Sequence, residues 1–182
     1  MYPEHISPLL SLTKEIILVD EHDRPIGEEE KMRTHERGLL HRAFSVWIFN
    51  TEGELMLQQR AFGKYHCGGM WTNTCCSHPR PDEATIDAAY RRLQEEMGFD
   101  CDLREVMEFI YHVDFPNGLT EHEYLHVFIG RHDASPALNP EEASNFRWIS
   151  IKELREDIAA DPEKYTYWSR LTLKKLIEKN IV

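Results

Sequence analysis

Residues 83–99 read EATIDAAYRRLQEEMGF and form the most specific local pattern in the chain. Their apolar side chains recur every three or four positions, as they do on one face of an amphipathic helix. These side chains are Ile86, Ala89, Tyr90, Leu93 and Met97. Gly98 follows them, and glycine is the usual residue just past a helix end. The pattern therefore predicts a helix over residues 83–97.

Shorter apolar runs on both sides of this helix predict β-strands. They cover residues 15–20, 44–49, 54–59, 105–113, 121–129 and 146–149. A loop closed by Gly53 predicts that the second and third runs form a hairpin. Two more helices are expected at the end of the chain, one opening with a capping box at Ser150 and Glu153, the other at Asp161-Pro162. Because strands and helices mix without regular alternation, we expect an α+β fold with a mixed sheet flanked by helices.

Chain length, net charge and cysteine spacing exclude several classes of function. A chain of 182 residues fits one domain, residues 1–182, in which the first thirty or so residues and residues 131–145 are expected to be peripheral. The net charge of −11 argues against a nucleic-acid partner, because it repels phosphate backbones. The N-terminus has no basic leader, and the apolar runs are too short to span a bilayer, so we expect a cytoplasmic protein without a membrane partner. The four cysteines form no C-x-x-C pair, which disfavours a zinc knuckle.

Five side chains of the kind that bind metal ions are scattered along the sequence. They are His35, His41, His78, Glu121 and Glu123. Strand alternation places both glutamates on the same face as Leu125 and Val127, where carboxylates are costly unless they bind a metal or share a proton. The alternative is that this strand end is solvated. As ligands, the five would suit Mn²⁺ or Mg²⁺, or Zn²⁺ with tighter coordination.

A basic group could hold an anion. Its members are Lys31, Arg60, Lys64 and Arg92. Taken singly they are ordinary solvated charges, but guanidinium forks and ammonium groups together match the oxygens of one diphosphate.

The helix pattern extends into a longer motif, Ser77-x5-Glu83-x7-Arg91-Arg92-Leu93-Gln94-Glu95-Glu96-Met97-Gly98-Phe99. This motif resembles the Nudix box, which gathers carboxylates around metal ions bound to a diphosphate. A plain surface helix with an Arg92–Glu96 pair is the simpler alternative. The motif departs from the box twice, with Ser77 in place of a glycine and Arg92 in place of a glutamate. The second change replaces a metal-binding carboxylate by a cation, so we expect a Nudix fold without the usual hydrolytic centre.

Further segments resemble one family, the type I isopentenyl-diphosphate Δ-isomerases, from about residue 31 to residue 168. They are HRAFSVWIFN at 41–50, Arg60-x3-Lys64, WTNTCCSHP at 71–79, the altered box, Glu121-x-Glu123 and Tyr167-Trp168. The resemblance implies a Nudix-like domain that interconverts isopentenyl and dimethylallyl diphosphate. The reaction adds and removes protons on opposite faces of a carbon–carbon double bond, through a carbocation.

The resemblance also implies roles. The catalytic residues would be Cys76, Glu123, Tyr111 and Trp168, and the register from Trp71 to His78 selects Cys76 over Cys75. Cys76 could equally be a small buried apolar residue, and Trp168 a core anchor. His35, His41, His78, Glu121 and Glu123 would bind one metal ion, and Glu96 the Mg²⁺ that accompanies the diphosphate. Lys31, Arg60, Lys64 and Arg92 would bind the diphosphate, and no flavin is implied.

Two other functions remain open on the sequence. The first is a Nudix pyrophosphohydrolase of a nucleoside diphosphate derivative, against which Arg92 and Ser77 count. The second is a metal-sequestering or partner-binding module, in which Glu121 and Glu123 would be solvated. For the isomerase we expect a monomer or a weak homodimer.

Overall fold

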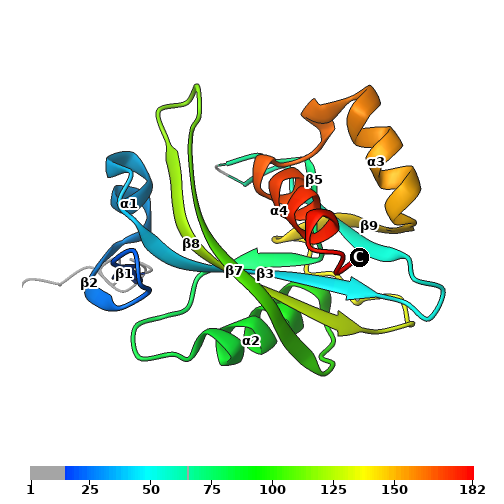
Figure 1. The fold of residues 1–182 in the computed structure, drawn as a ribbon, viewed down its shortest axis with the longest axis horizontal. Helices are drawn as coiled ribbons and strands as arrows, with labels where there is room; N and C mark the ends of the chain where they lie inside the picture. Colours follow the sequence, from blue (N-terminus) through cyan, green and yellow to red (C-terminus); the bar gives the residue numbers. More distant parts are fainter. Residues whose placement is uncertain (1–14, 65) are drawn as a thin grey trace, which may run out of the picture.

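The computed structural model describes residues 15–64 and 66–182. Within these residues a nine-stranded mixed sheet is packed with α-helices, so the expected α+β architecture is confirmed (Figure 1). The strands are β1 (Glu15–Val19), β2 (Pro25–Glu30), β3 (His41–Phe49), β4 (Leu55–Arg60), β5 (Trp71–Thr72), β6 (Cys75–Ser77), β7 (Leu103–Asp114), β8 (Thr120–Arg131) and β9 (Ala143–Ile149). The α-helices are α1 (Lys31–Arg37), α2 (Thr85–Met97), α3 (Ile151–Ala160) and α4 (Tyr167–Glu178).

Strand β3 organises the sheet. It runs parallel to β8 from the His41–Glu123 pair to the Phe49–Arg131 pair, and β6 pairs antiparallel with its other edge. Since both edges of β3 are taken, β4 pairs with it only at Phe49–Leu55 and then continues beside β9 and β5. The predicted hairpin of β3 and β4 therefore forms next to its loop, but the two strands separate after one residue pair. The sheet divides at this point.

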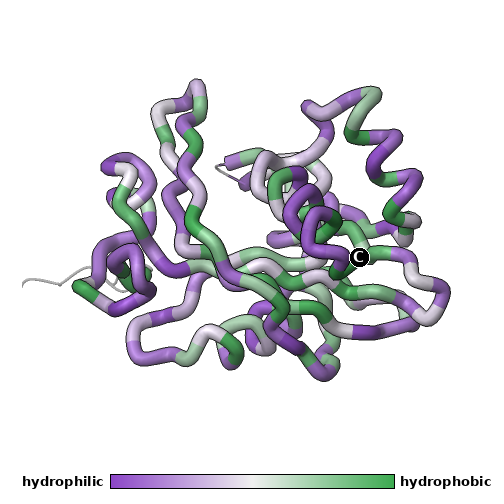
Figure 2. The backbone as a smooth tube through the Cα atoms, viewed as in Figure 1, coloured by the Kyte–Doolittle hydropathy of each residue, from purple (hydrophilic) through white to green (hydrophobic). Residues whose placement is uncertain are grey.

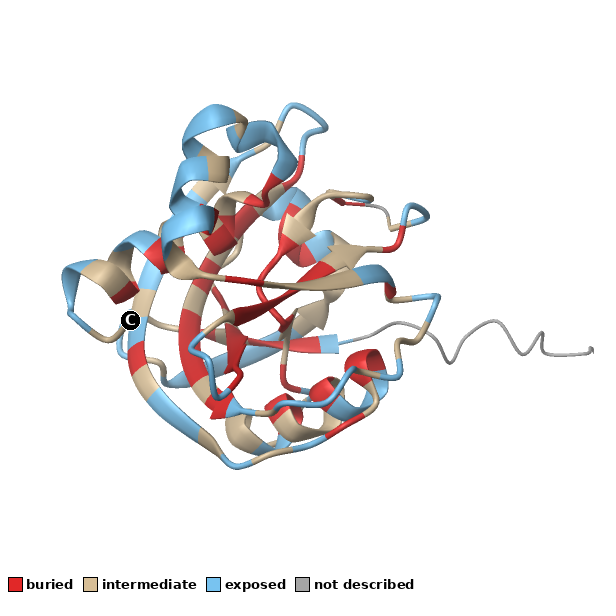
Figure 3. Cartoon of the chain, turned by 90° about the vertical axis from the view of Figure 1, so that its right-hand side faces the viewer, coloured by how far each residue is buried: buried red, intermediate tan, exposed pale blue. Residues whose placement is uncertain are grey.

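Side chains of β3 alternate between two hydrophobic cores. Ala43 and Trp47 face the core that contains residues of α3 and α4, whereas Phe44 and Val46 face the core built on α2. The two cores therefore lie on opposite faces of the strand. Figure 2 shows the hydrophobic stretches concentrated in the central strands, and Figure 3 shows that these strands are largely buried.

The predicted helix ends are confirmed except at two starts, of which the first is that of α2, at Thr85 instead of residue 83. Helix α2 ends at Gly98, whose φ of 74° is left-handed, and α3 begins with the predicted capping box at Ser150. The last helix, however, does not begin at Asp161-Pro162. Residues Pro162–Lys164 form only a 3-10 turn, and the amide of Thr166 donates a hydrogen bond of 2.9 Å to the carbonyl of Trp71. This contact with β5 keeps the backbone extended, so α4 starts after Thr166.

The segments expected at the surface are only partly there. In β1, Ile16, Ile17 and Val19 are buried, and Ala143 at the start of β9 is 1% exposed, so the expectation was wrong for these side chains. The expectation for residues 1–14 lies outside the described residues. Among the described helices, none is both long enough and apolar enough to cross a membrane.

Candidate active site

The predicted metal-binding side chains meet at one edge of the sheet. His41 begins β3, and Glu121 and Glu123 lie at the start of β8. Because β3 and β8 are parallel and in register at His41–Glu123, their first residues lie side by side. His35 comes from α1, and His78 directly follows β6. Three stretches of the chain that are distant in sequence, residues 35–41, residue 78 and residues 121–123, therefore place their polar side chains at one point.

Main-chain carbonyls orient two of the imidazoles. The Nδ1 atom of His35 donates to the carbonyl of Lys31 at 2.6 Å, and that of His41 donates to the carbonyl of Leu39 at 2.8 Å. A carbonyl can only accept, so in the neutral form of such a ring Nε2 is the nitrogen with the free lone pair. Burial lowers the pKa of His41 to about 4 and that of His78 well below its usual value, which keeps both rings neutral.

The two carboxylates are buried, with Glu121 6% and Glu123 8% exposed, so the solvated alternative is wrong. Burial alone would raise the pKa of Glu121, but the contact of its Oε2 with Nε2 of His35, at 3.2 Å, and the neighbouring histidines lower the pKa to about 2. Burial, together with the charge of Glu121, raises the pKa of Glu123 well above its usual value. Tyr111 donates a hydrogen bond of 2.8 Å to Oε2 of Glu123. One carboxylate is therefore held ionised and the other favours its proton.

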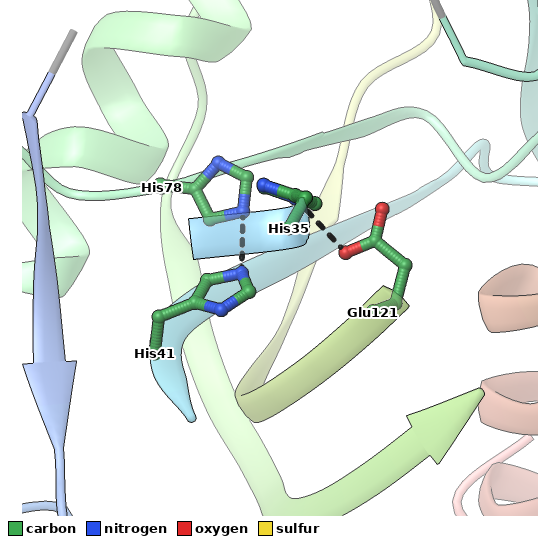
Figure 4. Close-up of side chains that lie close together, drawn as sticks. All are labelled: His35, His41, His78 and Glu121. Atoms are coloured by element: carbon green, nitrogen blue, oxygen red, sulfur yellow. Dashed lines mark hydrogen bonds and ion pairs between the residues drawn. The ribbon is translucent and has the colours of Figure 1, made fainter. Parts of the chain in front are cut away.

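A divalent metal ion fits this cluster. His35, His41, His78 and Glu121 each offer one ligand atom, and these atoms lie within 4.8 Å of one another (Figure 4). The Nε2 atoms of His41 and His78 are 3.2 Å apart, a contact that requires a cation or a proton between two ring nitrogens. Nε2 of His35 and Oε2 of Glu121 are buried without a hydrogen-bond partner. Imidazole and carboxylate together suit Mn²⁺ and Zn²⁺.

Glu123 borders this group, since its Oε1 lies 3.4 Å from Nε2 of His78. Glu96 does not belong to it. On α2 its carboxylate accepts hydrogen bonds from Arg92 at 2.7 Å and from the amide of Gln58 at 2.9 Å. The Mg²⁺ role suggested for Glu96 therefore concerns a separate place beside Arg92.

A small cavity of about 50 Å³ adjoins the cluster. Its lining includes Cys76, Glu123 and Trp168. Alternation along β6 sends Cys75 into the α2 core, where it is fully buried, and turns Cys76 toward the cavity. The thiol of Cys76 donates to Oδ1 of Asn73 at 3.0 Å, and burial raises its pKa to about 12. Cys76 is therefore a protonated thiol at neutral pH.

Trp168 is held in place by its own hydrogen bond. Its indole Nε1 donates to Oγ1 of Thr72 at 3.0 Å, and the side chain is 7% exposed. The guanidinium carbon of Arg60 lies 5.5 Å from the centre of the indole ring. The fixed indole is therefore one wall of the cavity, with a cation next to it.

The basic residues border a larger cavity of about 760 Å³, which Lys31, Lys64 and Arg92 line. Lys31, Ser77 and His78 line both cavities, so the two spaces meet there. Arg60 belongs to the smaller one. The structure thus brings all four predicted cations to connected spaces next to the buried group of histidines and glutamates.

Two side chains at the site were not anticipated. Nε2 of His66 lies 3.5 Å from Oε1 of Glu121, and Glu142 forms ion pairs with Lys64 and Arg92. His66 lies in the loop between β4 and β5, and Glu142 lies just before β9. Neither has periodic neighbours that would signal its direction, so only the folded structure could identify them.

Comparisons with known proteins agree with the geometry. The family model described as NUDIX domain matches residues 39–169. Isopentenyl-diphosphate Delta-isomerase 2 of Aromatoleum aromaticum is 52% identical over 163 residues, which cover 90% of this chain and 86% of the relative. Isopentenyl-diphosphate Delta-isomerase of Serratia proteamaculans is 50% identical over 161 residues, covering 88% of this chain and 90% of the relative.

Solved structures show the same fold at lower identity. DR0079 from Deinococcus radiodurans has a TM-score of 0.73 at 21% identity, covering 88% of this chain and 98% of its own. The MutT protein from Methanosarcina mazei has a TM-score of 0.63 at 17% identity, covering 78% of this chain and 95% of its own. The fold is therefore that of a NUDIX domain, and identities near one half over most of both chains narrow the assignment further. The chain belongs to the isopentenyl-diphosphate Delta-isomerase family.

Proposed function

We propose that this chain interconverts isopentenyl diphosphate and dimethylallyl diphosphate. The proposal rests mainly on where two side chains that can carry a proton lie in the fold. Cys76 lies on β6 and Glu123 on β8, two strands that pair with opposite edges of β3, and both side chains line one buried cavity. A substrate carbon held between them can receive a proton from one side and lose a proton to the other.

The proton balance needs only these two groups. Protonation of the terminal carbon of the double bond gives a tertiary carbocation, and loss of a proton from the neighbouring methylene gives the product. Burial raises the pKa of both Cys76 and Glu123, so either can hold a proton at neutral pH. Tyr111, bonded to Glu123, assists the transfer on that face. For turnover, one group must carry a proton and give it to the substrate, while the opposite group must be deprotonated and accept the proton that the substrate loses. Proton exchange with solvent then restores both groups for the next turnover.

The walls of the cavity protect the intermediate. In this proposal the π face of Trp168 stabilises the cationic carbon, an attraction worth about 2 kcal/mol when desolvated. The cavity of about 50 Å³ leaves little room for water, which would otherwise trap the cation as an alcohol.

The diphosphate would be held at the entrance by Lys31, Arg60, Lys64 and Arg92, with Mg²⁺ bound through Glu96. Anchoring the charged end aligns the double bond with Cys76 and Glu123. When bound at His35, His41, His78 and Glu121, a divalent ion, Mn²⁺, Zn²⁺ or Mg²⁺, supplies positive charge next to both buried carboxylates. Arg92 stands where hydrolases of this fold have a glutamate, which favours isomerisation over hydrolysis.

The test is isotope incorporation. Incubating the protein with isopentenyl diphosphate and Mg²⁺ in D₂O should yield deuterated dimethylallyl diphosphate by NMR. Cys76→Ala should slow turnover by about 100-fold or more, the usual contribution of a positioned acid or base. Cys75→Ala is the matched control, since Cys75 points into the α2 core, and it should turn over close to the wild-type rate.

Unchanged substrate with the metal-loaded wild type would reject the isomerase. Release of phosphate from nucleoside diphosphates would then support the hydrolase alternative. The burial of Glu121 and Glu123 disfavours the alternative of a metal-sequestering or partner-binding module. The monomeric or weakly dimeric state stays a prediction.

A further inference from the structure

His66 is contacted from several sides next to the group of possible metal ligands. The residue lies in the loop between β4 and β5 and is 5% exposed. The imidazole meets the ring of Phe115 edge-on, with 4.3 Å between centroids, and lies 5.6 Å from the ring of Trp168. A ring packed between two aromatic side chains has a fixed direction.

The backbone of His66 is fixed as well. Nε and a terminal nitrogen of Arg60 donate to its carbonyl oxygen at 3.3 and 3.0 Å. Arg60 ends β4, so the loop is attached to the sheet at this point. Both the main chain and the ring of His66 are therefore positioned before any ligand binds.

The two oxygens of Glu121 face different histidines. Oε2 lies 3.2 Å from Nε2 of His35, whereas Oε1 lies 3.5 Å from Nε2 of His66. Figure 4 shows the second oxygen of Glu121 turned away from His35, His41 and His78. His35 belongs to the group of possible metal ligands, and His66 stands outside it. One carboxylate thus spans an inner and an outer imidazole.

We propose that His66 is a positioning residue for Glu121. By contacting Oε1 of Glu121 through its Nε2, His66 fixes the orientation of the carboxylate plane. In this orientation Oε2 points toward the place where a metal ion would bind. Outer partners of this kind are known to orient metal-binding carboxylates, and their loss typically costs 10- to 100-fold in metal affinity. The inference rests on the metal site of the proposed function, and it assigns His66 no contact with the substrate.

Metal affinity of the whole chain provides the test. Metal-free wild type, His66→Ala and His66→Gln would be titrated with Zn²⁺ against a chromogenic chelator. We expect His66→Ala to bind Zn²⁺ roughly 10- to 100-fold more weakly than the wild type. His66→Gln keeps an N–H donor at a similar distance along the side chain and should recover most of the affinity. The visible spectrum of the Co²⁺-loaded protein should shift in His66→Ala and return in His66→Gln.

A matched control separates this contact from the general loss of an imidazole. His122→Ala removes a histidine that follows Glu121 directly in the chain but faces the other side of β8, where its Nδ1 lies 3.0 Å from the carbonyl of Gly38, so its Zn²⁺ affinity should stay near that of the wild type. The role would be rejected if His66→Ala binds Zn²⁺ as the wild type does, if His122→Ala weakens binding equally, or if His66→Gln gives no recovery. Thermal melting of the metal-free variants checks that all of them fold. Because the titration needs no substrate, it decides the role of His66 whatever the isomerase assay gives.

Discussion

One oxygen of the Glu142 carboxylate lies 3.0 Å from a guanidinium nitrogen of Arg92 and forms an ion pair with Lys64 as well. Burial would raise the pKa of Glu142, but hydrogen bonding to Lys64 and the charge of Arg92 lower it, so this carboxylate is ionised at neutral pH. Two of the cations proposed to bind the diphosphate are therefore already neutralised from within the protein.

This relationship predicts that Glu142 competes with the incoming anion. Glu142→Gln should bind inorganic pyrophosphate about tenfold more tightly, equivalent to about 1.4 kcal/mol, because Lys64 loses its counter-charge and Arg92 loses one of its carboxylate partners. Calorimetric titration at fixed ionic strength measures this. Glu141→Gln is the control, since Glu141 lines the same cavity and its replacement changes the net charge equally. Equal gains in both variants would attribute the effect to overall charge and contradict the competition.

The metal site predicts a ligand-dependent stability. Zn²⁺ at about 100 times its dissociation constant should stabilise the wild type by about 2.7 kcal/mol. His78→Ala should lose most of this gain at the same Zn²⁺ concentration, and its metal-free form should be less stable than the metal-free wild type by about 1 kcal/mol, because the buried hydrogen bond with Nε2 of His41 is removed. Urea unfolding with and without Zn²⁺ measures both quantities.

The control for this experiment is His122→Ala. His122 lies between Glu121 and Glu123 on β8, so it faces the other side of the strand, where its Nδ1 meets the carbonyl of Gly38 at 3.0 Å. It should keep the full response to Zn²⁺. A His78→Ala protein that gains as much stability as the wild type would show that this histidine is not a ligand.

Acid should selectively remove one stabilising contact. The guanidinium of Arg91 donates two hydrogen bonds, of 2.6 and 2.8 Å, to the carboxylate of Glu83. These hydrogen bonds lower the pKa of this carboxyl below its usual value of 4.5. A lowered pKa in the folded state means that the contribution is complete above about pH 4.5 and disappears as the pH falls through the folded value. Glu83→Gln should therefore cost about 1 kcal/mol at pH 7 and much less at pH 3.

Paired urea unfolding curves at the two pH values test this expectation. Glu178→Gln serves as control, because its ion pair with Lys174 spans 3.7 Å between exposed side chains and should contribute little. A Glu83→Gln difference that is the same at both pH values would contradict ionisation as its source.

Much of the architecture was predictable because its signals are local. Helix α2 was evident from its apolar spacing and from Gly98, and the start of α3 from the capping box at Ser150. Strand alternation also indicated that Glu121 and Glu123 point inward, which their burial confirms. Each of these inferences needed only residues that are close in sequence.

The remainder depends on long-range pairing. No local pattern shows that both edges of β3 are occupied, so the early separation of β4 was not foreseen. The delayed start of α4 likewise results from a contact with Trp71 in a distant loop. His66 and Glu142 joined the site for the same reason, since irregular segments give no periodicity from which a side-chain direction can be derived.

The parallel pairing of β3 with β8 also sets the order in which the site can form during synthesis. His41 and Glu123 are neighbours in the sheet although 82 positions separate them in the chain, so their alignment must wait until β8 has emerged and docked. Until then a growing chain presents His35, His41 and His78 without Glu121, and lacks the carboxylate that completes the group. The full set of ligands is therefore available only after about two thirds of the polypeptide has been made.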